Sequence, residues 1–341
     1  MGFADSLKRP SLWRAAILKE RDMTMLKERG FYKGVNLGGW FSQCDYSPER
    51  LDTFITEPDF AQIARWGFDH VRIPIDYNVI QNADGSMKEE GLRRIDGALA
   101  LCDKYGLHAV LDLHKTQGFS FDKGEKEAGF FESEEYQEKF YAIWECFARR
   151  WGDRAERVMF ELLNEVTFQE YLPAWKRISR ECVRRIRAYA PEVTVLLGSY
   201  NWNSAKTLPE LDAPYDEHVI YNFHFYEPHF FTHQGAYWMA DTLDLSLRYP
   251  YARIGVDQAW FEDFLRPALE KAEQEGTELY CGEYGVIDVV PPEEAVKWFR
   301  DLHAVFERHG IARSVWSYKE MDFGLQDKRM DGVREELLGL L

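Results

Sequence analysis

The chain has 341 residues, of which 45% are hydrophobic and 15% aromatic, and its formal net charge is −16. This length suits one large α/β barrel with extended loops, so the sequence does not require a second domain. The negative charge disfavours nucleic acid, anionic membranes and acidic polysaccharides, so we expect a neutral ligand and no nucleic-acid or membrane partner. No obligate protein partner is inferred. The five cysteines show no C-x-x-C spacing, which indicates free thiols.

The N-terminal residues give an expectation about location. They lack the apolar segment and small-residue cleavage site of a secretory signal peptide, and no run of about 18 apolar residues occurs. The chain as given is therefore expected to be cytoplasmic, or secreted if a signal peptide has been trimmed. Residues 1–32 precede the first predicted strand, and we expect this extension to cover the bottom of a catalytic barrel formed by residues 33–341.

Eight short apolar runs have the character of strands. They are residues 34–37, 70–74, 108–114, 158–165, 193–198, 219–224, 278–283 and 312–316. Segments with helical periodicity lie between them and stop before Gly106, Gly152 and Gly310, as helices often do. This alternation predicts parallel strands closed into a single-domain (β/α)8 TIM barrel. An open doubly wound sheet is the alternative, but residues 34–39 lack its G-x-G-x-x-G phosphate-binding spacing.

Two long connections follow predicted strands. Residues 115–135 come after the third strand, and residues 225–256, which are dense in aromatic and histidine side chains, come after the sixth. Both begin at the barrel edge where the carboxyl ends of the strands meet. We expect these extended loops on the C-terminal face to shape substrate specificity.

Two glutamates close strand-like runs that lie far apart in the chain. Glu165 ends the run 158–165, and Glu283 ends the run 278–283. Strands four and seven face each other across a narrow barrel interior, so the two carboxyl groups should converge. Such a pair, with one group ionised and the other protonated, is what cleavage of a glycosidic bond requires. The pair therefore predicts a glycoside hydrolase.

Other polar side chains follow the predicted strands and could tune this pair. Arg72 lies at the end of the second strand, where a fixed cation would keep Glu283 ionised. His224 and Tyr226 end the sixth strand, next to the seventh. We expect the phenol of Tyr226 to donate a hydrogen bond to Glu283, and the imidazole of His224 to tune both carboxyl groups.

Three further residues at strand ends are candidates for binding a sugar. His114 ends the third strand, Asn164 precedes Glu165, and Trp316 ends the eighth strand. Each residue taken singly has an ordinary structural explanation as a backbone cap, a core ion pair or a barrel plug. Independent structural roles do not explain why so many polar and aromatic residues occupy one edge of the same predicted barrel.

Together these residues resemble glycoside hydrolase family five. The matching positions are Arg72, His114, Asn164-Glu165, His224-Phe-Tyr226, Glu283 and Trp316, and the resemblance spans about residues 33 to 320. The segment 33–40, K-G-V-N-L-G-G-W, also looks like the opening strand of glucan-cleaving members. The resemblance implies that Glu165 is the acid/base, that Glu283 is the nucleophile, and that Asn164 donates to the sugar 2-hydroxyl.

The resulting hypothesis is a retaining β-glycosidase that acts by double displacement without a metal or other cofactor. The resemblance allows several neutral oligosaccharide or polysaccharide substrates, and we favour β-linked glucose chains, especially soluble oligosaccharides. A β-mannan-cleaving enzyme or an exo-acting hydrolase of small glycosides is the alternative within the family. Trp40, Trp202 and Trp238 are candidate platforms for stacking on sugar rings, with a place in the core as the alternative for each.

Two rival functions come from other classes. A metal-dependent barrel hydrolase could use Asp112 and His114 as ligands, but the first strand lacks the usual His-x-His, and Glu283 would have no role. A sugar-binding barrel without catalysis would most simply have lost one of the two carboxylates, and both are present.

Overall fold

The computed structural model describes residues 25–122 and 124–341. Eight parallel strands hydrogen-bond in chain order, and β8 pairs with β1, so the sheet is a closed barrel. The strands are β1 Lys33–Asn36, β2 His70–Asp76, β3 His108–Lys115, β4 Val158–Glu161, β5 Thr194–Gly198, β6 Val219–Phe225, β7 Leu279–Tyr284 and β8 Ala312–Val315. The predicted (β/α)8 barrel is confirmed, and the open sheet is excluded.

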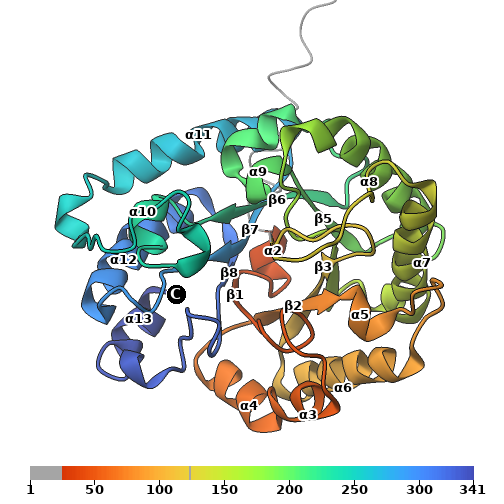
Figure 1. The fold of residues 1–341 in the computed structure, drawn as a ribbon, viewed down its shortest axis with the longest axis horizontal. Helices are drawn as coiled ribbons and strands as arrows, with labels where there is room; N and C mark the ends of the chain where they lie inside the picture. The colour runs from red at the N-terminus through yellow and green to blue at the C-terminus, as the bar shows by residue number, and fades with distance from the viewer. Residues whose placement is uncertain (1–24, 123) are drawn as a thin grey trace, which may run out of the picture.

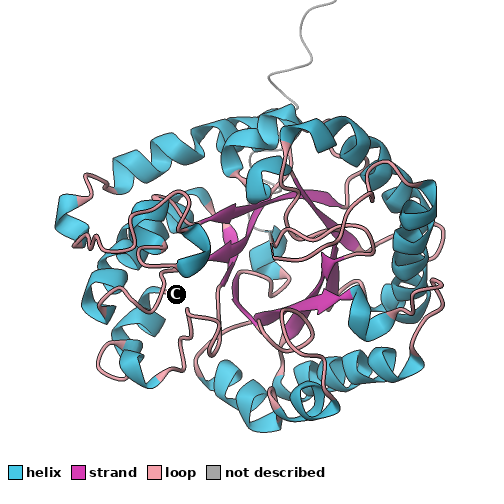
Figure 2. Cartoon of the chain, viewed as in Figure 1, coloured by secondary structure: helices cyan, strands magenta, loops and turns pink. Residues whose placement is uncertain are grey.

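Helices enclose the ring of strands (Figures 1 and 2). The long helices are α6 Glu89–Tyr105, α7 Glu134–Trp151, α8 Leu172–Arg187, α11 Gln258–Glu275 and α12 Pro292–His309. The shorter helices are α2 Met25–Glu28, α3 Pro48–Thr53, α4 Glu57–Arg65, α5 Tyr77–Ile80, α9 Tyr200–Asn203, α10 His229–Thr232 and α13 Arg334–Leu340. None of the helices in the described ranges is long and apolar enough to cross a membrane.

The three predicted helix ends differ in their geometry. Gly106 after α6 and Gly310 after α12 have φ of 71° and 64°, the left-handed conformation that glycine adopts without strain. Gly152 has φ of −66° and instead begins a 3-10 turn. Glycine is needed there because a Cβ atom would lie 2.5 Å from Cβ of Ala190. The predicted end at residue 152 is therefore correct, but close packing is its cause.

The amino-terminal end of the barrel is covered by residues 25–32. The backbone N–H of Leu26 donates to the carboxylate of Glu278, just before β7. Arg29 donates to the hydroxyl of Thr194, the first residue of β5. Phe31 and Tyr32 pack with inward-facing residues of the strands, and Figure 1 shows α2 in the centre of the ring. The remainder of the predicted extension, residues 1–24, lies outside the described residues.

Candidate active site

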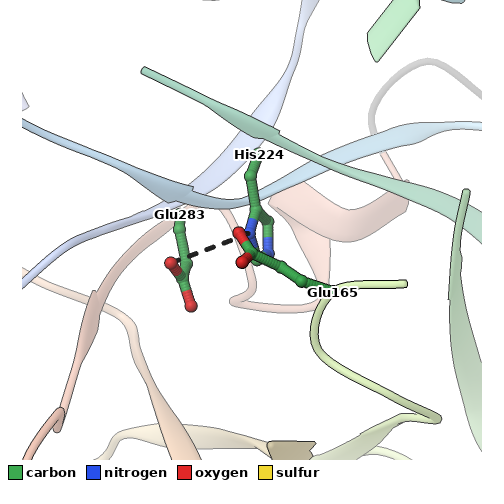
Figure 3. Close-up of side chains that lie close together, drawn as sticks. All are labelled: Glu165, His224 and Glu283. Atoms are coloured by element: carbon green, nitrogen blue, oxygen red, sulfur yellow. Dashed lines mark hydrogen bonds and ion pairs between the residues drawn. The ribbon is translucent and has the colours of Figure 1, made fainter. Parts of the chain in front are cut away.

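Glu165 and Glu283 meet at the carboxyl end of the barrel. Nδ1 of His224 lies 2.7 Å from Oε1 of Glu165 and 3.6 Å from Oε2 of Glu283 (Figure 3). One carboxylate oxygen of each glutamate and a ring nitrogen of His224 lie within 4.8 Å of one another. Retaining glycosidases hold their carboxyl groups about 5 to 5.5 Å apart, whereas inverting enzymes leave about 6.5 to 9.5 Å for a water. The spacing therefore fits direct attack by one carboxylate.

The two glutamates are held by different kinds of structure. Glu283 belongs to β7. The sequence predicted a strand that runs to Glu165, but β4 ends at Glu161, so Glu165 lies on the loop that follows. This loop is held at both sides of Glu165. The N–H of Asn164 donates to the carbonyl of Leu113 over 3.1 Å, and the N–H of Trp202 donates to the carbonyl of Val166 over 3.1 Å.

Arg72 is a completely buried cation beneath Glu283. Its Nη1 atom lies 2.7 Å from Oε1 of Glu283, and its Nη2 atom donates to Oδ1 of Asn164 over 2.7 Å. Its place in β2 differs from the prediction, because the strand continues to Asp76 and Arg72 projects from its first half into the barrel. A fixed guanidinium at this distance favours the ionised form of the carboxyl group.

Tyr226 contacts the other oxygen of the same carboxylate. Its hydroxyl donates to Oε2 of Glu283 over 3.0 Å, as the sequence indicated. The ring is held edge-on by His233 and Phe323, at centroid distances of 5.0 Å and 5.8 Å. Both oxygens of Glu283 thus have hydrogen-bond donors that orient the carboxylate.

The pKa values of the two carboxyl groups are shifted in opposite directions. Burial raises the pKa of Glu165, and the negative charge of Glu283 adds to this shift. Burial also acts to raise the pKa of Glu283, but His224 and Arg72 outweigh it, and the pKa is lowered. Burial disfavours the charged imidazole, yet the carboxylates of Glu283, Glu161 and Glu165 raise the pKa of His224 to about 10. These shifts favour one protonated acid next to one carboxylate, the arrangement that glycoside cleavage needs.

Two predicted binding residues present polar atoms to the site without partners among the described residues. Nδ1 of His114 lies 2.7 Å from Oδ2 of Asp112, which leaves Nε2 unpaired. Oδ1 of Asn164 is taken by Arg72, which leaves Nδ2 unpaired. Buried polar atoms are normally satisfied, so these two are free to bind sugar hydroxyl groups.

Trp316 is buried beside His114. The two rings are parallel within 3°, with centroids 5.8 Å apart. A Cβ atom at Gly38 would lie 2.8 Å from the indole, so glycine at this position leaves space for the ring. The resulting flat surface at the end of β8 is suited to one face of a sugar.

The three predicted stacking platforms have different environments. Trp202 is half-buried and lines a cavity of about 170 Å³ with Phe168 and Tyr171. Trp238 is 38% exposed and meets His233 edge-on. Trp40 has the core environment that the sequence analysis gave as its alternative.

Trp40 is a core residue. Its side chain is only 5% exposed, it stacks on Phe41 at 3.9 Å, and its Nε1 donates to the carbonyl of Leu51 over 2.8 Å. Phe41 therefore covers a face of the indole, and the carbonyl of Leu51 satisfies its polar edge.

Several polar residues around the site were missed by sequence reasoning. They are Asn36, Asp112, Glu161 and Asn222, all completely buried; Asp112 was considered only as a metal ligand. Each belongs to a strand, in which side chains alternate between the barrel interior and the surrounding helices. The signal that could have found them is a polar residue inside an apolar run on the inward side of that alternation.

The site also contains groups that could in principle bind a metal ion. Glu165, His224 and Glu283 offer three ligand atoms close together. However, Nη1 of Arg72 already lies 2.7 Å from a carboxylate oxygen of Glu283, and its positive charge opposes a second cation. Asp112 and His114, the ligands of the rival hypothesis, bond to each other, and Arg72 lies 3.0 Å from Asp112. This arrangement does not favour a metal centre.

Comparison with known proteins agrees with this geometry. Residues 31–322 match the family described as Cellulase (glycosyl hydrolase family 5). The chain is 56% identical over 289 residues to Cellodextrinase A of Ruminococcus flavefaciens, covering 85% of this chain and 86% of that protein. It is 37% identical over 337 residues to Endoglucanase C of Acetivibrio thermocellus, covering 91% and 98% respectively.

Solved structures share the fold. An endoglucanase superposes with a TM-score of 0.78 at 22% identity, covering 92% of this chain and 99% of that one. The cellulose synthase subunit Z (CcsZ) of Clostridioides difficile superposes with a TM-score of 0.77 at 25% identity, covering 91% and 99%. The match to the family spans most of the chain, and the protein belongs to the cellulase family, glycosyl hydrolase family 5.

Proposed function

We propose that this glycosidase hydrolyses soluble β-1,4-linked glucose oligosaccharides with net retention, using Glu283 as the nucleophile and Glu165 as the acid/base. The spacing of the two carboxyl groups and the opposite directions of their pKa shifts carry the proposal. Two donors hold Glu283, whereas Glu165 is bonded to His224 and has a raised pKa. This asymmetry distinguishes the nucleophile from the acid.

The reaction proceeds in two displacements. In the first, a carboxylate oxygen of Glu283 attacks the anomeric carbon, the bond to the leaving oxygen breaks, and Glu165 gives its proton to that oxygen. In the second, Glu165 takes a proton from water, and the water oxygen displaces Glu283 from the anomeric carbon. Asn164, with its free Nδ2 atom, would donate to the 2-hydroxyl group of the sugar at the reacting centre.

A cavity near the loop that carries Glu165 would provide room for the leaving sugars. It is lined by Thr167, Phe168, Tyr171 and Trp202 together with residues of the segments 118–122 and 125–132. Thr167 follows the proposed acid by two positions, which supports placing the leaving sugars in this cavity. Aromatic faces suit the apolar faces of glucose rings.

The preference for short β-1,4-linked chains draws on one observation: the relative that is 56% identical is named Cellodextrinase A. The preference for neutral sugars is supported by three glutamates, Glu125, Glu127 and Glu132, which line the cavity and would repel acidic sugars.

The test is a time course of product lengths from cello-, manno- and laminari-oligosaccharides and from matching aryl β-glycosides, run beside the Glu283→Ala variant. We expect wild type to cleave the cello series fastest and the variant to cleave none. Proton NMR of the first turnovers should show the β-anomer before mutarotation. Faster cleavage of either other series, or initial release of the α-anomer, would refute the proposal.

A further inference from the structure

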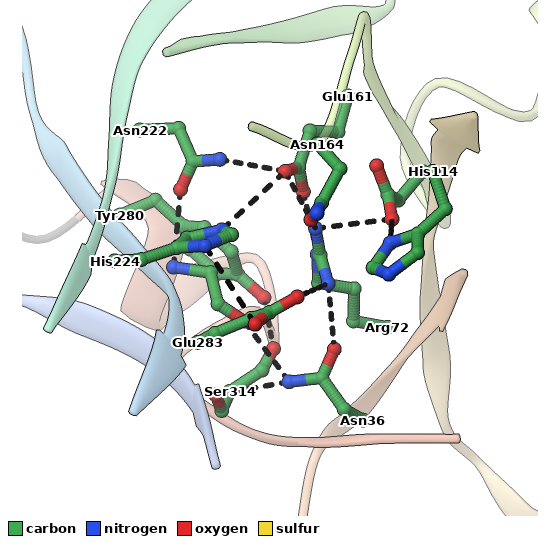
Figure 4. A network of polar contacts seen from close by, with 12 residues as sticks. Asn36, Arg72, His114, Glu161, Asn164, Asn222, His224, Tyr280, Glu283 and Ser314 are labelled. Carbon is green, nitrogen blue, oxygen red and sulfur yellow. Dashed lines mark hydrogen bonds and ion pairs between the residues drawn. The ribbon is translucent and has the colours of Figure 1, made fainter. Parts of the chain in front are cut away.

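Glu161, the last residue of β4, is a completely buried carboxylate with no role in the two displacements. Its Oε2 atom accepts a hydrogen bond from Nε of Arg72, and its Oε1 atom accepts one from Nη2, both over 2.7 Å. Oε1 also accepts from Nδ2 of Asn222 over 2.7 Å (Figure 4). Two parallel bonds to a guanidinium fix the orientation of its plane as well as its position.

The orientation of the Arg72 guanidinium sets the geometry of its hydrogen bond to Glu283. Glu161 accepts hydrogen bonds from Nε and Nη2 of Arg72. Nη1 and Nη2 also donate to Asn36, Asn164 and Glu283. The distances to their oxygen atoms are 2.9, 2.7 and 2.7 Å. Because the guanidinium is rigid and planar, a rotation that broke the bonds to Glu161 would misalign the bond to Glu283 as well.

A second route leads from Glu161 to the same carboxylate. Asn222 donates to Glu161 and accepts from the backbone N–H of Gly282 over 3.0 Å. Gly282 directly precedes Glu283 in β7, and a Cβ atom there would lie 2.8 Å from Oδ1 of Asn222. The amide is thus packed against the backbone that carries the nucleophile. Oε1 of Glu161 also lies 3.9 Å from Nε2 of His224, whose other nitrogen faces both reacting carboxyl groups.

We propose that Glu161 is a positioning residue for the nucleophile, which sets the carboxylate of Glu283 in line for attack by holding Arg72 and Asn222 and by placing its charge beside His224. It does not touch the reacting atoms, and its charge balances the buried guanidinium. The inference rests on the proposed function, because it takes Glu283 as the attacking group.

The experiment compares covalent trapping of wild type, Glu161→Gln and Glu307→Gln by 2,4-dinitrophenyl 2-deoxy-2-fluoro-β-cellobioside. Dinitrophenolate leaves without a proton, so the rate of trapping reports attack by Glu283 and not acid catalysis by Glu165. Glu307 is a matched control, because it also pairs with a buried arginine, Arg313, but at the opposite end of the barrel.

We expect trapping of Glu161→Gln to slow about a hundredfold at saturating reagent, since a small misplacement of a reacting group costs this much. The concentration for half-maximal rate should change little, and Glu307→Gln should stay within about twofold of wild type. Trapping of a folded Glu161→Gln protein at the wild-type rate would overturn the inference. If that variant does not fold, the Glu161→Asp variant replaces it in the experiment. Aspartate keeps the charge but cannot span both nitrogens of Arg72, so this variant should be trapped about tenfold more slowly than wild type. Trapping of Glu161→Asp at the wild-type rate would also overturn the inference.

A substrate-free readout separates this inference from the proposed function. The carboxylates of Glu161, Glu165 and Glu283 face His224, so loss of one should move the imidazole titration of His224 to lower pH, as seen by ¹⁵N NMR. If wild type takes no label, the proposed function fails, and the His224 titration alone then tests the inference about Glu161. An unchanged midpoint in Glu161→Gln would then contradict the placement of Glu161 beside His224.

Discussion

The Nη1 atom of Arg72 lies 2.7 Å from Oε1 of Glu283, inside a barrel where both side chains are almost completely removed from water. The contact is an ion pair and a hydrogen bond at once. It places a permanent positive charge where the proposed nucleophile must remain ionised.

Replacing Arg72 with lysine should lower kcat/KM on cello-oligosaccharides by about a hundredfold or more, because an ammonium cannot reproduce the planar set of donors. The matched control is Arg94→Lys, which alters a surface pair with Asp52 and should leave kcat/KM unchanged. Equal activity of Arg72→Lys and wild type would show that any cation suffices at this position.

Replacing Glu165 with glutamine should remove the proton donor without displacing the nucleophile. We expect hydrolysis of unactivated cellotetraose to fall by about 10² to 10⁴, whereas formation of the glycosyl-enzyme from a dinitrophenyl β-cellobioside should be nearly retained. Pre-steady-state release of dinitrophenolate measures the latter step. The exposed neighbour Glu170→Gln serves as a control. A comparable loss on both substrates would contradict the assignment of Glu165 as the acid.

The pH dependence of kcat/KM should be bell-shaped, and the two pKa shifts set its limbs. Glu283 must be ionised, so activity is lost as pH falls through its pKa, which lies below the ordinary glutamate value. Glu165 must be protonated, so activity is lost as pH rises through its pKa, which lies above that value. Residual activity of Glu283→Gln should lack the acid limb, and persistence of an unchanged acid limb would argue against this origin.

Trp202 should contribute to binding of the leaving sugars. The Trp202→Ala variant is expected to lower kcat/KM on cellotetraose about tenfold, which corresponds to about 1.4 kcal/mol. It should leave β-cellobiosyl fluoride unaffected, because a fluoride leaving group is too small to reach the cavity. Steady-state kinetics on the two substrates provides the comparison, and an equal loss on both would place Trp202 outside the leaving-group site.

Trp40 should behave as a core residue. The Trp40→Ala variant is expected to lower the free energy of unfolding by about 3 to 5 kcal/mol, because it empties a site filled by a buried indole. Equilibrium denaturation in urea measures this change. A variant with wild-type stability and a raised KM would instead restore the platform assignment.

The barrel could be predicted from sequence because eight short apolar strands recur along the chain. Three of the segments between them show a helical periodicity that ends at a glycine, and closure was inferred from the number of strands. The convergence of Glu165 and Glu283 followed from that topology alone. The roles of the site residues stay predictions, although the geometry brings all but Trp40, Trp202 and Trp238 around one centre.

The remaining features depend on which side chains meet in three dimensions. Glu161 was read as part of a strand that ended at Glu165, because spacing does not show where the chain leaves the sheet. Sequence could not choose between the platform and core alternatives for Trp40, because the carbonyl of Leu51 meets its polar edge only after folding. The left-handed backbone of Asn201, Trp202 and Asn203, with φ between 52° and 57°, was also not foreseen, although asparagine adopts this conformation more readily than most residues.

The central claim is that Glu283 forms a covalent bond to the sugar. The most direct measurement is mass spectrometry of peptides from the protein inactivated with 2,4-dinitrophenyl 2-deoxy-2-fluoro-β-cellobioside. The account predicts one fluorocellobiosyl group per chain, attached to Glu283. A label on any other residue, Glu165 included, or continued turnover of cello-oligosaccharides by protein that never takes up the label, would contradict it.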